Sequence, residues 1–111
     1  MADADVLVDR RSAPRVAMVL GAEIVELPRG ARLNARSADI SRSGCYIDTL
    51  NPIPSGSRVR VRLTHETELF DVTAKVVYVS PGLGMGLQFE EPVPLEQRAI
   101  LDRWLNEPPS V

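Results

Sequence analysis

The chain of 111 residues carries a net charge of −2, 44% hydrophobic residues and one cysteine. This length supports one domain with a single modest core, and no apolar run is long enough to span a bilayer. The single cysteine excludes an internal disulfide, and the first residues lack the basic and apolar segments of a secretory signal. We therefore expect a cytoplasmic protein with no membrane attachment.

The first segment in chain order is acidic, and the next is basic. Residues 1–9 contain three acidic residues and no basic one, and we interpret them as a flexible tail that precedes a domain at 10–107. Residues 10–62 contain ten arginines against four acidic residues, whereas residues 63–111 contain three basic residues against eight acidic ones. An anionic ligand is therefore expected to bind the first half of the domain.

The next segments favour β-structure, because short apolar or alternating runs are separated by turn signals rich in proline and glycine. An arm at 10–15 leads into the first of these runs. The predicted strands span residues 16–27, 32–41, 45–49, 58–63, 69–79 and 85–89. Alternation in the fifth strand predicts one common face for Phe70, Val72, Ala74, Val76 and Tyr78.

The last element is a predicted helix at 94–105, opened by Pro94 and followed by Pro108 and Pro109. Its apolar residues Ile100, Leu101, Trp104 and Leu105 fall on one helical face. Six short strands with turns about every ten residues predict a mainly β protein, namely a small antiparallel barrel with one C-terminal helix.

Two short motifs carry candidate binding residues. Arg11 and Arg15 form an R-x-x-x-R pattern directly after Arg10, and guanidinium groups bind phosphate oxygens and the O6/N7 edge of guanine bidentately. The second motif, D-x-S-x-x-G, contributes the carboxylate of Asp39, the hydroxyl of Ser41 and a flexible residue at Gly44. A carboxylate accepts hydrogen bonds from the N1–H and exocyclic amine of guanine, and glycine permits close backbone approach.

The two motifs, in this order and about 25 residues apart, resemble those of the PilZ domain, a bacterial receptor module for cyclic di-GMP. Residues 74–78 followed by the G-x-G-x-x-F run at 84–89 also resemble the late hairpin of that family. The resemblance covers nearly the whole chain and implies a single six-stranded barrel with a terminal helix. Many family members carry tryptophan where this chain has Tyr78.

The resemblance implies specific roles for the motif residues. It places Arg11 and Arg15 on the phosphates and the Hoogsteen edge of guanine, and Asp39 on the base. Ser41 would either bind a phosphate or brace the turn, and a side chain at Gly44 would collide with the ligand or require an unusual φ. Arg10 would add a third cation on the arm. Further candidates are Arg42, Ser43 and Tyr78, with Tyr78 either stacking on a base or being a core or rim residue of the barrel.

The implied function is a cyclic di-GMP receptor whose N-terminal arginine arm becomes ordered on the ligand and which signals to an unidentified partner protein. We expect no enzymatic activity, cofactor or metal, because no nucleophile with an orienting base and no ligand cluster is apparent. Two alternatives stay open. One is a PilZ-like protein–protein interaction module that does not bind nucleotide. The other is a small barrel that binds single-stranded nucleic acid, which five aromatic residues and an acidic pI make less favourable.

Three other features have simpler interpretations. Arg58, Arg60 and Arg62 share one face of a strand, which predicts an outer solvated face or, alternatively, a docking stripe for an acidic partner. Cys45 is expected to be a small buried strand residue. His65 is the only histidine and lies in a turn, which argues against a metal role.

Overall fold

The structure, a computed structural model, describes residues 14–28 and 30–108. The predicted tail at 1–9 and most of the arm at 10–15, including Arg10 and Arg11, lie outside the described residues. The strands are β1 (Val16–Ala17), β2 (Gly21–Glu26), β3 (Arg32–Ile40), β4 (Gly44–Asp48), β5 (Arg58–His65), β6 (Glu68–Ser80) and β7 (Gly84–Phe89). They are followed by one helix, α2 (Leu95–Asn106).

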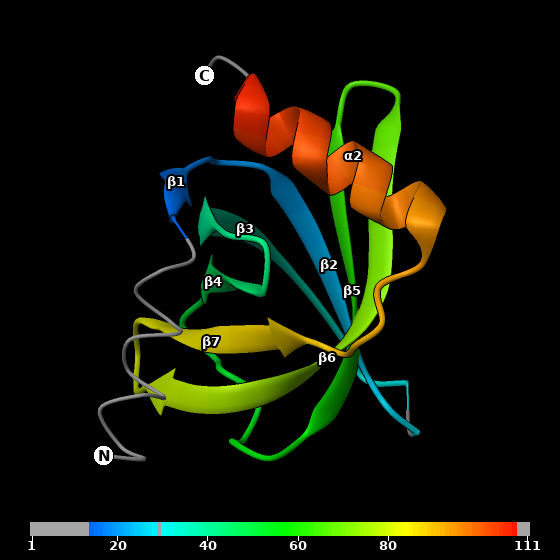
Figure 1. The fold of residues 1–111 in the computed structure, drawn as a ribbon. Coiled ribbons are helices and arrows are strands. Elements are labelled where there is room, and N and C mark those ends of the chain that lie inside the picture. Colours follow the sequence, from blue (N-terminus) through cyan, green and yellow to red (C-terminus); the bar gives the residue numbers. More distant parts are fainter. Residues whose placement is uncertain (1–13, 29, 109–111) are drawn as a thin grey trace, which may run out of the picture.

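The predicted six-stranded antiparallel barrel is confirmed. The strands pair in the order β3-β2-β5-β6-β7-β4, and a further pairing of β3 with β4 closes the ring (Figure 1). The two-residue strand β1 adds to the end of β3 through the pairs Val16–Ile40 and Ala17–Asp39. Closure removes the exposed strand edges that an open sheet would present to other chains.

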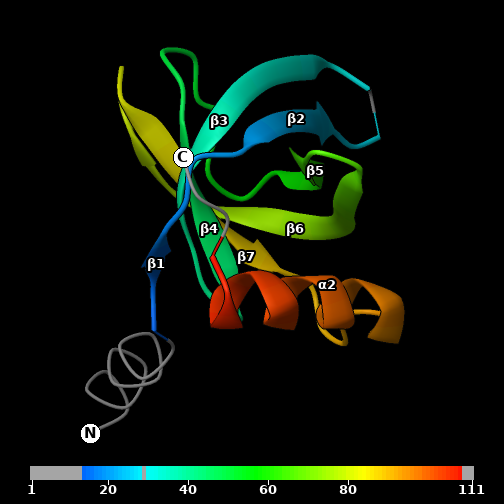
Figure 2. The same ribbon diagram turned by 90° about the horizontal axis from the view of Figure 1, so that it is seen from above.

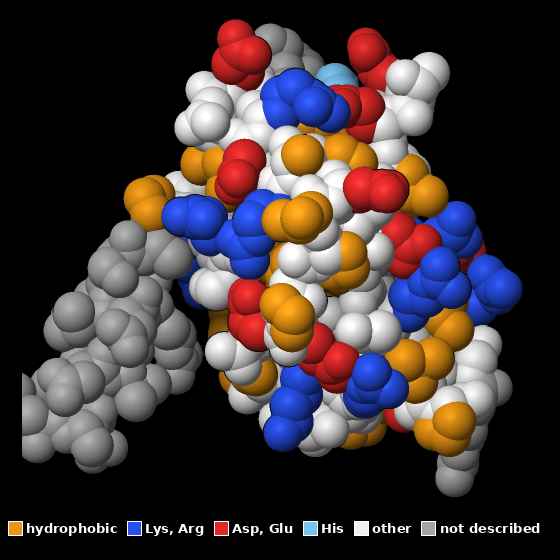
Figure 3. Space-filling view, turned by 45° about the vertical axis from the view of Figure 1, so that its right-hand side comes forward, with side chains coloured by type: hydrophobic (Ala, Val, Ile, Leu, Met, Phe, Trp, Pro, Cys, Tyr) orange, Lys and Arg blue, Asp and Glu red, His pale blue; other side chains and the backbone are white. Residues whose placement is uncertain are grey.

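The core follows from alternation along the strands. In β5, Val59, Val61 and Leu63 are fully buried, while the arginines between them face outward. Outward-facing basic and acidic side chains are interspersed over the visible surface of the molecule (Figure 3). Burial of an aliphatic side chain contributes about 1.5–3 kcal/mol, so this alternation fixes which face of the strand is inside.

The helix α2 lies outside the ring of strands when the barrel is viewed from above (Figure 2). Leu101 and Trp104 are buried and join the core, as the predicted apolar face requires. The indole Nε1 of Trp104 donates to Glu68 Oε1 at 2.8 Å, and Arg103 also contacts this carboxylate. The helix begins one residue later and ends one residue later than predicted, and the N–H of Glu107 donates to the carbonyl of Arg103 at its end.

The predicted strand at 16–27 is interrupted at residues 18–20, where it has one residue more than the facing part of β3, opposite Ser37. This fully buried serine donates from Oγ to the carbonyl of Met18 at 2.6 Å and accepts from the N–H of Leu20 at 3.0 Å. Its side chain therefore replaces backbone hydrogen bonds of the ladder, beside a register shift in β3 between Ser37 and Asp39. A serine in a strand gives no sequence signal for such a break.

Arg58, Arg60 and Arg62 form the predicted outer solvated face, and each pairs with a carboxylate. Arg58 binds Glu90 through Nε at 2.6 Å and Nη2 at 2.9 Å, and Thr73 donates to the same carboxylate at 2.9 Å. The Arg58 hydrogen bonds, and then the Thr73 bond, lower the pKa of Glu90 from 4.5 to about 2.

Replacement of Arg58 by glutamine is expected to raise the pKa of Glu90 from about 2 toward its ordinary value of 4.5. Because the folded-state pKa is depressed, the stabilisation is complete above the ordinary pKa and is lost as the pH falls toward 2. The wild type and Arg58→Gln should therefore differ in stability near neutral pH and converge in strong acid. An NMR titration of the glutamate carboxyl carbons measures the shift, and an unchanged Glu90 titration would contradict the assigned cause.

Candidate functional site

Most of the predicted site residues that the structure describes meet at one cavity of about 320 Å³. The predicted members that line it are Arg15, Asp39, Ser41, Ser43, Gly44 and Tyr78. They come from the residue before β1, the end of β3, the β3–β4 turn, the start of β4 and the late part of β6. The barrel therefore brings together residues that are more than 60 positions apart in the chain.

The pairing of β1 with β3 places the positive and negative groups of the cavity side by side. Val16 pairs with Ile40 and Ala17 with Asp39, so Arg15 precedes β1 next to the end of β3. Arg15 Nη1 lies 3.8 Å from Asp39 Oδ2, and the Arg15 side chain is 52% exposed. This long contact leaves most guanidinium N–H donors of Arg15 available to an incoming anion.

Ser41 braces the turn between β3 and β4, which is one of the two roles that the sequence left open for it. Its N–H donates to the carbonyl of Gly44 at 2.8 Å, and its Oγ accepts from the N–H groups of Ser43 and Gly44 at 3.2 Å each. The residue is buried yet lines the cavity. The serine of the second motif thus holds the loop that carries the other motif residues.

Gly44 is required by packing, and neither a ligand clash nor an unusual φ is needed to explain it. A Cβ at this position would overlap the carbonyl oxygen of Leu87 on the neighbouring strand β7. The φ of Gly44 is not positive, in contrast to those of Gly30, Gly56 and Gly82. The motif glycine therefore allows β4 and β7 to approach closely at the cavity wall.

Tyr78 does not share the core face predicted for it. A register shift between Val76 and Tyr78 in β6 moves the ring to the outer face. There it lies over Gly86, where any Cβ would meet the ring, while a Cβ at Gly84 would overlap the Ile47 carbonyl oxygen and the Tyr46 ring. The two ring centroids are 6.0 Å apart, so the glycines of β7 leave room for an aromatic surface beside the cavity.

Five further cavity residues were not assigned to the site from the sequence, namely Cys45, Val77, Gly86, Leu87 and Gln88. Val77 is the extra residue at the register shift and is 41% exposed. Gln88 is exposed and alternates with the buried Leu87 and Phe89. The alternation along this strand therefore indicates from the sequence alone that the Gln88 side chain points outward. The position of Gln88 beside Gly44 depends on the register between β4 and β7, and no local feature of the sequence indicates that register.

Arg42 does not line the cavity, although it belongs to the second motif. Its Nε lies 3.9 Å from Asp102 Oδ1 on α2. The buried Cys45 lies in the cavity wall, where burial and then the charge of Asp39 raise the pKa of the thiol. In the described part of the chain, no group of three or more His, Cys, Asp or Glu residues is arranged to hold a metal ion.

The fold is similar to solved PilZ structures. The PilZ domain of CeSA from a cellulose-synthesizing bacterium has a TM-score of 0.68 and 16% identity over 85% of this chain and 96% of that one. The PilZ domain of YcgR from Escherichia coli, solved with c-di-GMP, has a TM-score of 0.68 and 17% identity over 85% and 87% of the two chains.

The Bacillus subtilis inhibitor of motility (MotI/DgrA) has a TM-score of 0.68 and 20% identity over 90% of this chain. The chain spans 54% of that protein. At these identities the likeness concerns the fold alone. A search of curated proteins finds no significant match. Within the described residues, no helix is long and apolar enough to cross a membrane.

The family model of the PilZ domain matches residues 9–107 and so includes both motifs, the barrel and the helix. The PilZ domain is a non-catalytic receptor module, which agrees with the absence of enzymatic activity expected from the sequence. A match over this much of the chain, on a barrel that gathers the motif residues at one cavity, shows that the chain belongs to the PilZ domain family.

Proposed function

We propose that this protein is a cytoplasmic cyclic di-GMP receptor that binds the dinucleotide at the cavity and signals to a partner protein. The observation that carries the proposal is the convergence of Arg15, Asp39 and Tyr78 on one cavity. A guanidinium, a carboxylate and an aromatic ring are the groups that a phosphate, a guanine edge and a base plane require. A structure similar to this fold was solved with c-di-GMP, which supports the assignment.

In this proposal each group has one task. Arg15 donates to a phosphate or to the guanine O6/N7 edge, and Arg11 and Arg10 join it from the preceding arm. Asp39 accepts from the guanine N1–H and amine, while its long contact with Arg15 gives way to the ligand. Tyr78 offers a stacking surface worth about 1–3 kcal/mol per base. Ser41 and Gly44 keep the turn in place.

The two alternative functions, a protein–protein interaction module and a barrel for single-stranded nucleic acid, predict different ligands and different surfaces. An interaction module without nucleotide binding does not need the cationic and anionic groups that surround this cavity. A barrel for single-stranded nucleic acid usually offers several exposed aromatic residues along a basic groove. Here Phe70, Phe89 and Trp104 are buried in the core, which leaves Tyr46 and Tyr78.

Calorimetric titration with cyclic di-GMP and with a mixed single-stranded oligonucleotide separates these functions. We expect saturable binding of the dinucleotide and no comparable binding of the oligonucleotide. Tight oligonucleotide binding would favour the nucleic-acid function. Failure of both to bind would favour the interaction module.

We also expect the site to select guanine over adenine. Cyclic di-AMP should bind far more weakly than cyclic di-GMP, because adenine has an acceptor at N1 and no amine at C2. The carboxylate of Asp39 would then face a lone pair with no hydrogen-bond donor, and a buried unpaired group costs about 1–3 kcal/mol. Competition between the two dinucleotides measures the difference. Equal affinities would mean that phosphate charge alone drives binding and that Asp39 has another role.

The signalling step is expected to order the arm. Ligand phosphates should draw residues 10–15 toward Asp39 and the turn at Ser41, which changes the shape and charge of the surface that a partner meets. Backbone amides of residues 1–15 should therefore exchange rapidly in the free protein and become protected with cyclic di-GMP, as hydrogen exchange can measure. An arm equally protected in both states would contradict this mechanism.

A further inference from the structure

A second charged surface lies on the outer side of the barrel and shares no residue with the cavity lining. Its side chains project from the neighbouring strands β3, β2, β5 and β6, and from the residue that follows β7. We name it the basic face and define it by the cations Arg32, Arg58, Arg60, Arg62 and Lys75 and the carboxylates Glu23, Asp71 and Glu90. The cations exceed the carboxylates, although the whole chain is negatively charged.

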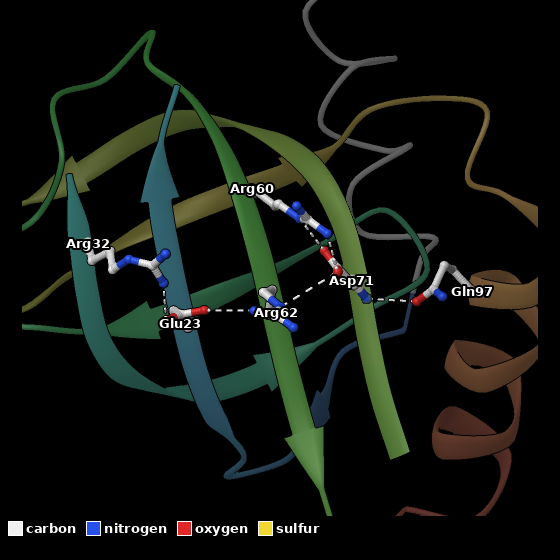
Figure 4. A network of polar contacts seen from close by, with 6 residues as sticks. All are labelled: Glu23, Arg32, Arg60, Arg62, Asp71 and Gln97. Carbon is white, nitrogen blue, oxygen red and sulfur yellow. Dashed lines mark hydrogen bonds and ion pairs between the residues drawn. The ribbon is translucent and has the colours of Figure 1, made fainter. Parts of the chain in front are cut away.

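Part of the basic face is a connected network of Arg32, Glu23, Arg62, Asp71 and Arg60 (Figure 4), and Arg58 and Glu90 form a separate pair. Glu23 accepts from Arg32 Nη1 at 2.7 Å and from Arg62 Nη1 at 3.1 Å. Asp71 accepts from Arg60 through Nε at 2.7 Å and Nη2 at 2.6 Å, and Arg62 Nε lies 3.5 Å from the same carboxylate. Asp71 is tied to the helix as well, because its N–H donates to the Gln97 side chain at 2.7 Å (Figure 4).

The carboxylates lie beneath the arginines. The side chains of Arg32, Arg58 and Arg60 are 64%, 59% and 53% exposed, whereas those of Glu23, Glu90 and Asp71 are 28%, 36% and 16% exposed. A guanidinium has five N–H donors, so a bidentate pair leaves several of them for an outside acceptor. The surface presented to a partner is therefore cationic, even though the arginines are paired.

The carboxylates also hold the arginines in place. Arginine side chains fixed before binding lose less rotamer freedom when they meet a partner, which favours recognition of carboxylates by their planar fork. Alternate residues of β5 are about 7 Å apart, and alternate residues of an extended partner segment repeat at the same distance. The exposed Lys75 extends the face on β6 and makes no ion pair within the described residues.

We infer that the basic face is a docking surface for an acidic protein segment with carboxylates on alternate residues. Charge complementarity selects an anionic partner. A single-stranded nucleic acid is disfavoured because the aromatic side chains that would stack on bases lie in the core or beside β7. A duplex is disfavoured because three carboxylates within the face would oppose its phosphates.

The test uses the full chain and a short labelled peptide in which glutamate alternates with threonine, with fluorescence anisotropy as the measurement. The double variant Arg58→Gln/Arg60→Gln should weaken peptide binding about tenfold and reduce its salt dependence. The matched control is Arg42→Gln/Arg98→Gln, which also removes two arginines that pair with carboxylates but lie outside the basic face. The control should change the affinity less than about twofold.

A second variant, Lys75→Gln, removes a cation that makes no ion pair within the described residues and should also weaken peptide binding, so the test does not depend on the folding of the double variant. A DNA duplex of similar length serves as the competing anion. No peptide binding by the wild type would overturn the inference, as would equal losses in the face and control variants. Duplex binding as tight as peptide binding would also overturn it, in favour of a nucleic-acid surface.

Discussion

Replacing Arg15 with alanine is expected to weaken cyclic di-GMP binding by about tenfold or more and to leave the fold intact. A hydrogen bond to a charged group contributes about 1.5–3 kcal/mol, and tenfold in affinity corresponds to about 1.4 kcal/mol. Arg15 is half exposed, precedes β1 and makes one long contact with Asp39, so its removal takes nothing from the core. Calorimetry measures the affinity, and thermal unfolding measures stability in parallel.

The matched control is Arg98→Ala, because Arg98 pairs with Glu91 at 3.3 Å and lies on α2 away from the cavity lining. It should bind the dinucleotide like the wild type. The family motif predicts the same loss for Arg11→Ala as for Arg15→Ala. Unchanged affinity in both variants would mean that Arg11 and Arg15 do not belong to the binding site.

Replacing Gly44 with alanine is expected to destabilise the ligand-free protein by at least about 1–3 kcal/mol, the usual cost of an added methyl group in a well-packed interior. The new Cβ would overlap the Leu87 carbonyl oxygen, and backbone of a neighbouring strand cannot rotate away as a side chain can. Urea unfolding without ligand measures the loss.

Ser43→Ala is the neighbouring control, since Ser43 is exposed and its replacement removes at most the 3.3 Å contact with Ser41 Oγ. It should unfold close to the wild type. If Gly44→Ala kept full stability and lost only ligand affinity, the glycine would serve the ligand and the packing explanation would be wrong.

Some interpretations from the sequence needed the structure before they were complete. The sequence left open whether Ser41 binds a phosphate or braces the turn, and the structure shows the turn hydrogen bonds of Ser41. It also shows that a Cβ at Gly44 would overlap the Leu87 carbonyl, a packing reason that the motif does not indicate. Arg42 stands inside the motif but pairs with Asp102 on α2. Gly44 and Arg42 contact residues from distant parts of the chain. The contacts of Ser41 depend on a turn conformation that the motif sequence does not specify.

By itself, the sequence determined the strand positions apart from the break at residues 18–20, the helix with Leu101 and Trp104 inward, the barrel class and the motifs at Arg15 and Asp39. These depend on local properties, namely the period of two, turn residues and the period of a helix. Only the tertiary structure decided the break at residues 18–20 opposite Ser37, the outward turn of Tyr78, and the carboxylates beneath the arginines of the basic face. These depend on strand register, because one register shift moves a side chain from the core to the surface and changes which residues lie next to it on the neighbouring strands.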